Sequence, residues 1–295
     1  MSLEDAAAKA AGLPCWSGPV DPQPVSGGIT NTNFRVDDGG RSYMVRIGGN
    51  IPVHGIRRTY ETAASHAAHA VGVAPGVVFT TKGALVIDWI EGQTFSEAEA
   101  SDPANLSRIV ELLHRLHRDG AKHLRGRAPL FWVFHVVRDY GHRMIDDGHR
   151  LKGEVPRLMA LADELEKAVG AIELALCHND LLAANFIDDG SRLWLVDWEY
   201  AGYDTPFFDL ANLASNNQMD AGQQTALMEA YWGRAATTEN HHRLGAMMCA
   251  SLLREAMWGM VQEVHSSLDV DFEAYTAENT ARFEAALKDW RGGSS

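Results

Sequence analysis

Two stretches of the chain decide its fold: CHNDLLAANF at residues 177–186 and VDWEY at residues 196–200. Short β-type runs lie between them, and the signal Asp188-Asp189-Gly190 predicts a tight turn that joins these runs. A hairpin built in this way returns the chain to its starting point. It folds Asp197 back beside Asn185, so the polar side chains of both stretches meet in one place.

These polar side chains suit phosphoryl transfer to an alcohol. Asp180, on a loop, can accept the hydroxyl proton and orient the oxygen nucleophile. Asn185, five residues later, and Asp197, at the end of the return strand, offer the oxygen ligands that Mg²⁺ prefers. We interpret His178 as a buried brace of the loop. The alternative is that all four residues only cap a hairpin and its turns, as Asp and Asn often do; their joint pattern favours catalysis.

The first part of the chain contains short β-type runs at residues 34–36, 43–47, 77–79 and 84–90. Asp38-Gly39-Gly40 and Lys82-Gly83 are hairpin signals between successive runs. One helix separates the two hairpins, because apolar residues recur at helical spacing from Tyr60 to Val71 before a stop at Gly72. We expect a small antiparallel sheet with one helix.

Beyond residue 92 the pattern becomes mostly helical. Asp102-Pro103 begins an apolar stripe that ends before Gly120. Further helices are predicted near residues 156–169, 221–235, 240–265 and 271–290. We therefore predict an α+β, protein-kinase-like two-lobe fold. Residues 1–91 form a β-rich nucleotide-binding lobe, and residues 92–295 form a mainly helical lobe for catalysis and substrate binding, with the nucleotide in the cleft between the lobes.

Composition narrows the function classes. The chain has 295 residues and a formal net charge of -13, which disfavours binding to nucleic acid or to an anionic membrane surface and favours a cationic ligand. Its three cysteines form no CxxC pair, and neither a signal peptide nor a membrane-length apolar stretch is apparent. We expect a cytoplasmic enzyme; the oligomeric state is left open.

The motifs quoted above resemble the catalytic core of choline/ethanolamine kinases, within the protein-kinase-like aminoglycoside phosphotransferase superfamily. The resemblance rests on HNDLLAANF and on LWLVDWEYAGYDTPFFDLAN at residues 193–212, and it extends to residues 27–34, 43–47, 113–117 and 258–259. It implies a kinase that uses ATP and Mg²⁺, with Asp180 as catalytic base and with Asn185 and Asp197 as catalytic metal ligands. Asp209 matches the family aspartate that braces the catalytic loop.

The resemblance also assigns residues to the nucleotide. Arg46 occupies the strand position that grips phosphate oxygens, although it could instead be a solvated strand-edge charge. Glu61 would orient Arg46, and the rival interpretation is a salt bridge within the helix to Arg57 or Arg58. The phosphate-covering loop and the hinge that would bind adenine contribute the remaining predicted residues, which are Gly28, Thr30, Asn31, Asn33, Asp88 and Ile90.

The acceptor side departs from the family pattern. Trp258 matches a tryptophan of choline-kinase pockets, where aromatic faces bind a quaternary ammonium; the alternative is that it packs in the core. Tyr200, Glu199 and Asn216 are the other predicted substrate-binding positions. Family members often have a glutamate in place of Asn216 and a second tryptophan in place of Val261. We predict a small, cationic alcohol such as choline or ethanolamine; an aminoglycoside, another alcohol, or a catalytically silent kinase-like binding protein are the alternatives.

Overall fold

A five-stranded antiparallel sheet forms the amino-terminal region, in the order β1-β2-β3-β5-β4. The computed structural model describes residues 1–25 and 31–293. The strands are β1 (Gln23–Val25), β2 (Thr32–Asp38), β3 (Arg41–Ile47), β4 (Val77–Thr81) and β5 (Ala84–Asp88). Both predicted hairpins, β2–β3 and β4–β5, are confirmed. Gly39 and Gly40 turn the first hairpin with φ angles of 56° and 76°, a region that glycine enters freely.

Two helices accompany this sheet. The predicted helix is α2 (Arg58–Ala70), which packs against β4. A second helix, α1 (Leu3–Ala11), was not predicted; it begins with a capping box and buries two alanines against β2 and β3. Its buried positions, Ala6 and Ala10, do lie on one face of the helix.

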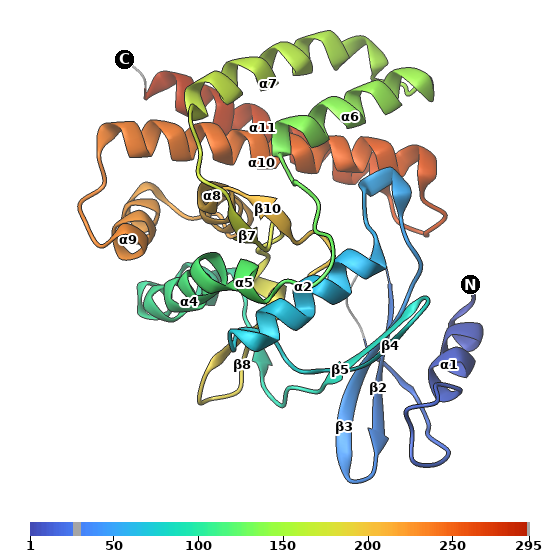
Figure 1. The fold of residues 1–295 in the computed structure, drawn as a ribbon. Helices are drawn as coiled ribbons and strands as arrows, with labels where there is room; N and C mark the ends of the chain where they lie inside the picture. Colours follow the sequence, from blue (N-terminus) through green and yellow to red (C-terminus); the bar gives the residue numbers. More distant parts are fainter. Residues whose placement is uncertain (26–30, 294–295) are drawn as a thin grey trace.

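Helices make up most of the carboxy-terminal region (Figure 1). The long ones are α4 (Pro103–Arg115), α6 (Val133–Asp146), α7 (Val155–Val169), α8 (Pro206–Asn216), α9 (Ala221–Trp232), α10 (Thr238–His265) and α11 (Phe272–Gly292). Short helical turns are α3 (Glu97–Ser101), η2 (Leu116–Gly120), α5 (Ala121–His123), η3 (Lys152–Glu154) and η4 (Ala183–Asn185). The predicted helices are confirmed to within a few residues. No residue range was predicted for α6 or α8, and the β-branched and aromatic residues and Gly141 of α6 have a low intrinsic helix propensity.

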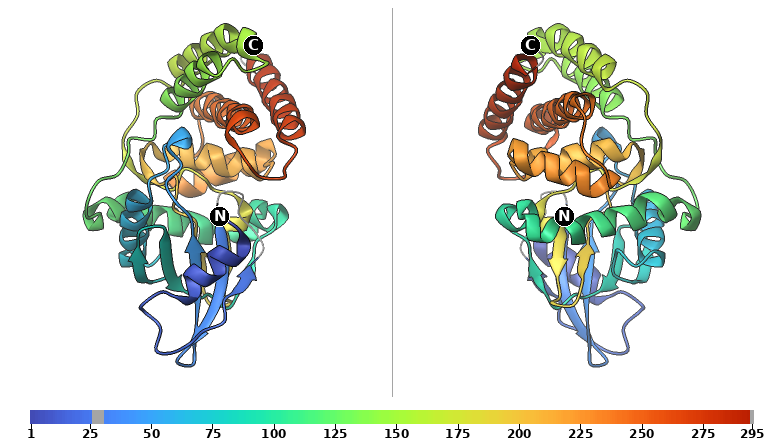
Figure 2. Two further views of the ribbon diagram at one scale, coloured as in Figure 1. Left: turned by 90° about the vertical axis from the view of Figure 1, so that its right-hand side faces the viewer. Right: turned by 90° about the vertical axis from the view of Figure 1, so that its left-hand side faces the viewer.

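Helix α10 is the centre of the helical region, where it packs against α6, α7, α8 and α11 (Figures 1 and 2). Its middle is almost entirely buried, and its apolar side chains belong to the larger of two hydrophobic cores. The smaller core lies between α1 and the amino-terminal sheet. The α+β, kinase-like arrangement of a sheet-rich region followed by a helical one is therefore confirmed.

Short strands also occur in the later part of the chain. β8 (Phe186–Asp188) and β9 (Leu193–Leu195) form the hairpin predicted from the motif, and β6 (Gln93–Thr94) pairs with β8. β7 (Ala175–Cys177) pairs with β10 (Gly202–Asp204) and leads into the catalytic loop. β6, just after the predicted boundary, thus pairs within the later part of the chain. We keep the division of the chain between residues 91 and 92 as a proposal.

A loop of the amino-terminal region reaches the helical region. Between β3 and α2 the chain rises to α10, and the turn η1 (Pro52–His54) lies against that helix (Figure 1). The imidazole of His54 stacks on the ring of Trp258, with centroids 5.4 Å apart. Its Nδ1 atom hydrogen-bonds with the hydroxyl of Tyr140 at 2.9 Å. This contact ties the two regions together beside the predicted acceptor site.

Burial of His54 should make stability depend on pH. Burial lowers its pKa from 6.5 to about 4, so the folded protein keeps neutral an imidazole that the unfolded chain protonates. The stabilisation is complete above pH 6.5 and is lost as the pH falls towards 4, by about 3 kcal/mol. In urea denaturation, wild type should lose about that much more than His54→Gln between about pH 7 and about pH 4. Parallel losses in the two proteins would contradict this account.

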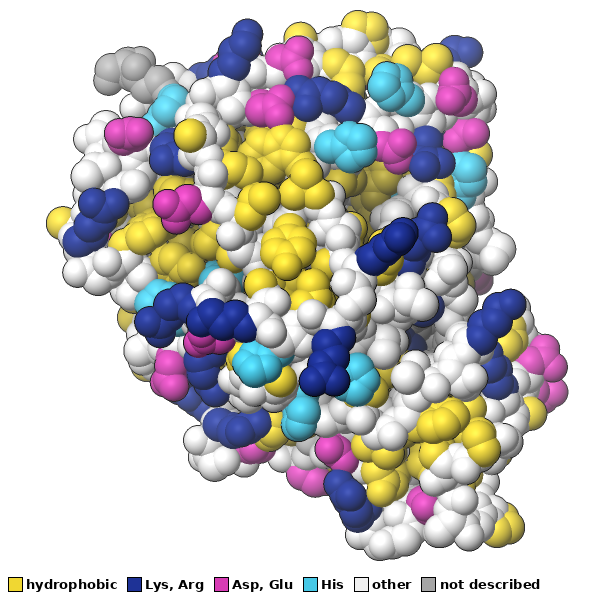
Figure 3. Space-filling view, in the orientation of Figure 1, with side chains coloured by type: hydrophobic (Ala, Val, Ile, Leu, Met, Phe, Trp, Pro, Cys, Tyr) yellow, Lys and Arg dark blue, Asp and Glu magenta, His cyan; other side chains and the backbone are white. Residues whose placement is uncertain are grey.

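The surface mixes both signs of charge. On the face shown in Figure 3, acidic and basic side chains are interspersed and hydrophobic side chains gather between them. Within residues 1–25 and 31–293, none of the helices has both the length and the apolar character that crossing a membrane requires.

Candidate active site

The catalytic loop follows β7 and is fixed by Asp209, in the first turn of α8. The buried Asp209 carboxylate accepts hydrogen bonds from the backbone N–H groups of His178 (2.9 Å) and Asn179 (2.8 Å), and it lies 2.9 Å from Nε2 of His117. Burial alone would raise the pKa of Asp209, but the hydrogen bond from His117 and its charge hold that pKa below its ordinary value. The predicted brace is present and fixes the backbone that leads into Asp180.

His178 joins this loop to the strand that returns from the hairpin. Its Nε2 lies 2.9 Å from the carbonyl oxygen of Val196, and its Nδ1 accepts from the backbone N–H of Asp180 at 3.3 Å. The backbone N–H of Val196 donates to the carbonyl of Asn185 at 3.0 Å. His178 is therefore the buried brace that was predicted. The same bonds place Asn185 beside Asp197, as the hairpin predicted.

Asp180 projects from this loop with its side chain 16% exposed. One carboxylate oxygen lies 3.3 Å from Nη2 of Arg254. Burial raises the pKa of Asp180 to about 7, and the charge of Arg254 acts in the opposite direction. A carboxylate that is partly exposed and that takes up a proton this readily is suited to receive one from a hydroxyl.

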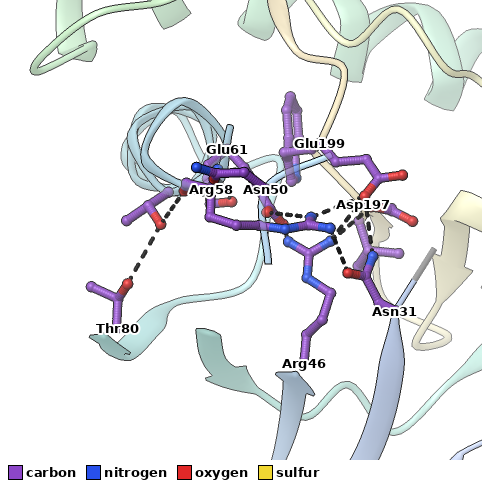
Figure 4. Close-up of polar contacts among 12 residues, drawn as sticks. Asn31, Arg46, Asn50, Arg58, Glu61, Thr80, Asp197 and Glu199 are labelled. Carbon is purple, nitrogen blue, oxygen red and sulfur yellow. Dashed lines mark hydrogen bonds and ion pairs between the residues drawn. The ribbon is translucent and has the colours of Figure 1, made fainter. Parts of the chain in front are cut away.

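Arg46 brings three elements together at the other side of the site (Figure 4). It lies on β3, forms an ion pair with Glu61 of α2, and donates to Asp197 at 3.1 Å. The Glu61 side chain is only 1% exposed. Burial and the neighbouring Glu199 raise the pKa of Asp197, and Arg46 opposes this. The interpretation of Arg46 as a solvated strand-edge charge is therefore wrong.

Arg58 is a site residue that sequence reasoning missed (Figure 4). Its Nη1 donates to Glu61 at 2.9 Å and to Glu199 at 3.0 Å, and its Nη2 donates to Asn31 at 2.6 Å. The pair within the helix and the pair between Glu61 and Arg46 thus exist together. Spacing along α2 indicated the first of these, but nothing local indicates a bond to Glu199. The structure brings Glu199 to this basic cluster.

A cavity of about 330 Å³ opens beside Arg46 and Asp197. Among its lining residues are six large apolar side chains, those of Val25, Met44, Leu85, Ile87, Trp89 and Ile90. Asn33, Asp88, Asn185 and Asp197 are among its polar lining residues. The Asp88 carboxylate accepts a bond from Arg41 at 2.7 Å. The predicted hinge therefore borders the cavity, while the predicted residues Gly28 and Thr30 lie outside the described residues.

The acceptor side is built around Trp258 of α10. Its Nε1 donates to the hydroxyl of Tyr200 at 3.0 Å, and its ring lies 5.5 Å from that of Tyr275. These two contacts bring Trp258 and Tyr200 together, as predicted. Asn216 is not joined to either by any hydrogen bond found within residues 1–25 and 31–293, and its Nδ2 is buried there without a hydrogen-bond partner.

Two further residues on α10 reach this side and were not predicted. They are Arg254 and Glu255, whose side chains hydrogen-bond to each other at 2.9 Å. Arg254 is nearly inaccessible, with 2% of its side chain exposed, yet it contacts Asp180. No motif carries them, because their role depends on which face of a long buried helix meets the catalytic loop.

The family profile of choline/ethanolamine kinases matches residues 23–244 of this chain. The chain belongs to this family. Ethanolamine kinase 2 of Mus musculus is 27% identical over 262 residues, which cover 79% of this chain and 66% of the mouse protein. The crystal structure of a choline/ethanolamine kinase family protein from Mesorhizobium loti is 30% identical, with a TM-score of 0.79, and the match covers 97% of this chain and 95% of that one.

The fold reaches beyond choline/ethanolamine kinases. A thermostable mutant of aminoglycoside phosphotransferase APH(4)-Ia, in ternary complex with AMP-PNP and hygromycin B, has a TM-score of 0.68 at 20% identity, over 92% of this chain and 95% of that one. Identity this low shows the fold alone. Family membership makes the protein a nucleotide-using small-molecule kinase that phosphorylates a small alcohol.

For this member of the choline/ethanolamine kinase family, Asp209→Asn should lower both stability and turnover. The new amide would direct its N–H groups at backbone N–H donors, and His117 would lose its charged partner, so the free energy of unfolding should fall by about 3 kcal/mol. Urea denaturation and a turnover assay measure the two effects. Asp139→Asn is the control, because the exposed Asp139 pairs with Arg143 on the same helix, and such pairs contribute about 0.5 kcal/mol. Equal losses in both variants would contradict the brace.

Proposed function

We propose that this kinase transfers the γ-phosphoryl group of ATP, with Mg²⁺, to the hydroxyl of a small, cationic alcohol such as choline or ethanolamine. The observation that carries the proposal is the convergence of Arg46, from the amino-terminal sheet, with Asp180, Asn185 and Asp197 of the catalytic loop and its hairpin. The side-chain amide of Asn185 donates to the backbone carbonyl of Asp180 at 2.8 Å, and Arg46 donates to the carboxylate of Asp197 at 3.1 Å. Arg46, Asn185 and Asp197 line the same cavity.

The residues present fit ATP and Mg²⁺. Asn185 and Asp197 border the same cavity and offer an amide and a carboxylate oxygen, the hard ligands that Mg²⁺ takes alongside phosphate oxygens. When bound, Mg²⁺ would neutralise charge on the triphosphate during transfer. The apolar lining of the cavity suits a purine ring, and Ile90 and the backbone beside Asp88 lie where a hinge would contact it.

The chain's own residues then have separate tasks. Arg46, held in one orientation by Glu61, grips phosphate oxygens with its planar guanidinium. Asp180 accepts the hydrogen bond of the acceptor hydroxyl and takes its proton as the oxygen attacks the γ-phosphorus. Asp209 and His178 are positioning residues, since they hold the backbone on either side of Asp180. Asn31 and Asn33 extend the polar edge of the nucleotide site.

The experiment is ADP release by the purified protein from ATP and Mg²⁺. Choline, ethanolamine, thiamine and a set of aminoglycosides serve as acceptors, and Asp180→Asn serves as the blank. We expect turnover with choline or ethanolamine that the variant loses. Turnover with aminoglycosides alone would show that the acceptor is an aminoglycoside and not a small alcohol such as choline or ethanolamine. Absence of both turnover and nucleotide binding would instead indicate a silent kinase-like binding protein.

A further inference from the structure

The acceptor side holds a buried cation of the protein itself. Arg254 lies on α10, and its Nη2 atom is 3.3 Å from an oxygen of Asp180 and 2.9 Å from an oxygen of Glu255. One nitrogen therefore touches two carboxylates that come from the catalytic loop and from α10. The distance between the two carboxylate oxygens therefore cannot exceed the sum of these two distances. The space beside Asp180 is thus bordered by a second, closely placed acid.

Glu255 is fixed but still reachable. One of its oxygens accepts from Arg254, and the other accepts from the hydroxyl of Tyr275. Its side chain is 19% exposed, against 2% for Arg254. Two acidic side chains, Asp180 and Glu255, thus share the one positive charge of Arg254. A positively charged acceptor would add a second positive charge at the accessible carboxylate.

The aromatic rings nearby are already in contact with other side chains. The guanidinium of Arg254 lies 5.1 Å from the ring centroid of Tyr200 and 5.9 Å from that of Phe131. The ring of Trp258 is stacked by His54 at 5.4 Å and flanked by Tyr275 at 5.5 Å. A quaternary ammonium has no N–H group and depends on open aromatic faces. Here the protein's own Arg254 and His54 already contact Tyr200, Phe131 and Trp258, and Val261 stands where family members often have a second tryptophan.

We propose that Glu255, held by Arg254 and Tyr275, is the counter-ion of the acceptor's ammonium group, and that the kinase selects an amino alcohol whose nitrogen carries N–H donors over a quaternary ammonium. This inference rests on the proposed function, in which the acceptor hydroxyl donates to Asp180. A 2-amino alcohol places its hydroxyl and its ammonium two carbons apart. That short span suits two carboxylates bridged by a single nitrogen, and each N–H can donate a charge-assisted hydrogen bond.

The test is kcat/KM along a methylation series: ethanolamine, N-methylethanolamine, N,N-dimethylethanolamine and choline. The first three keep at least one N–H group when protonated, and choline has none. We expect the steepest fall at the last step, with choline on the order of tenfold or more below ethanolamine, the loss expected for one charge-assisted hydrogen bond. This comparison uses wild-type protein, so it does not depend on a variant that folds.

Variants then test Glu255 itself. Glu255→Gln should lower kcat/KM for ethanolamine far more than for choline and so reduce the ratio between them; Tyr275→Phe should reduce the ratio less. Glu263→Gln is the matched control, because Glu263 is also on α10 and also pairs with an arginine, Arg150. Its ratio should equal that of wild type.

Each outcome separates the two claims. If wild type has the same kcat/KM for choline as for ethanolamine, this inference is overturned and the proposed function stands. A ratio that Glu255→Gln leaves unchanged would overturn the assignment of Glu255. Absence of ADP release with all four alcohols would remove the proposed acceptor class and this inference with it.

Discussion

Asp180→Asn should lower kcat by about 10²–10⁴-fold while the affinity for nucleotide stays the same. The amide keeps the shape of the carboxylate but cannot take the proton of the acceptor hydroxyl. The backbone carbonyl of Asp180 accepts from Asn185 at 2.8 Å, and the substitution leaves this bond in place. Single-turnover kinetics and a nucleotide titration measure the two quantities separately.

Asp188→Asn is the control for this variant. Asp188 lies on the same hairpin as the motif, and its carboxylate is bound by Arg108 at 2.7 Å, away from the cavity beside Arg46. Turnover of the control should match wild type. An Asp180→Asn protein that turns over its acceptor at the wild-type rate would show that another group takes the proton.

Asp197→Ala should weaken nucleotide binding in the presence of Mg²⁺ by at least about tenfold and should also lower turnover. The substitution removes one of the two proposed metal ligands and also a partner of Arg46. Binding measured by calorimetry in Mg²⁺ and again in EDTA separates these effects. The difference in nucleotide affinity between variant and wild type should be large in Mg²⁺ and small in EDTA. An equal difference in both conditions would mean that Asp197 acts through Arg46 and does not bind the metal.

The sequence predicted the fold well wherever local chemistry decides the structure. Glycines mark the β2–β3 hairpin and the end of α2, and apolar spacing marks α7, α10 and α11. No residue range was predicted for α1, α6 or α8. The buried residues of α1 and α6 do lie on one face of each helix, so the periodic signal was present and was overlooked.

Some features of the site could likewise be predicted from the sequence, and others could not. The catalytic loop, its brace Asp209 and the return of Asp197 to Asn185 follow from one motif and one hairpin, and the structure brings them together as expected. The role of each as catalyst or metal ligand stays a prediction. Arg254 could not be anticipated, since it comes from a helix far along the sequence and meets Asp180 only through the tertiary fold.

Alternatives that spacing left open also needed the structure. Glu61 has two basic partners, one on its own helix and one on β3, and no pattern within α2 could weigh them. Trp258 is buried among aromatic rings and contacts Tyr200, as core packing requires, and its role in acceptor binding stays a prediction. Contacts between residues far apart in the sequence decide such cases, and these contacts leave no periodic pattern in a single sequence.

The central claim is that the γ-phosphoryl group of ATP ends on the hydroxyl of a small, cationic alcohol. Phosphorus-31 NMR of a reaction with ATP, Mg²⁺ and ethanolamine follows that group directly. We predict a phosphomonoester signal that grows in step with ADP and that is absent with Asp180→Asn. ADP accompanied only by inorganic phosphate, with no phosphomonoester for any alcohol of the methylation series, would contradict the claim.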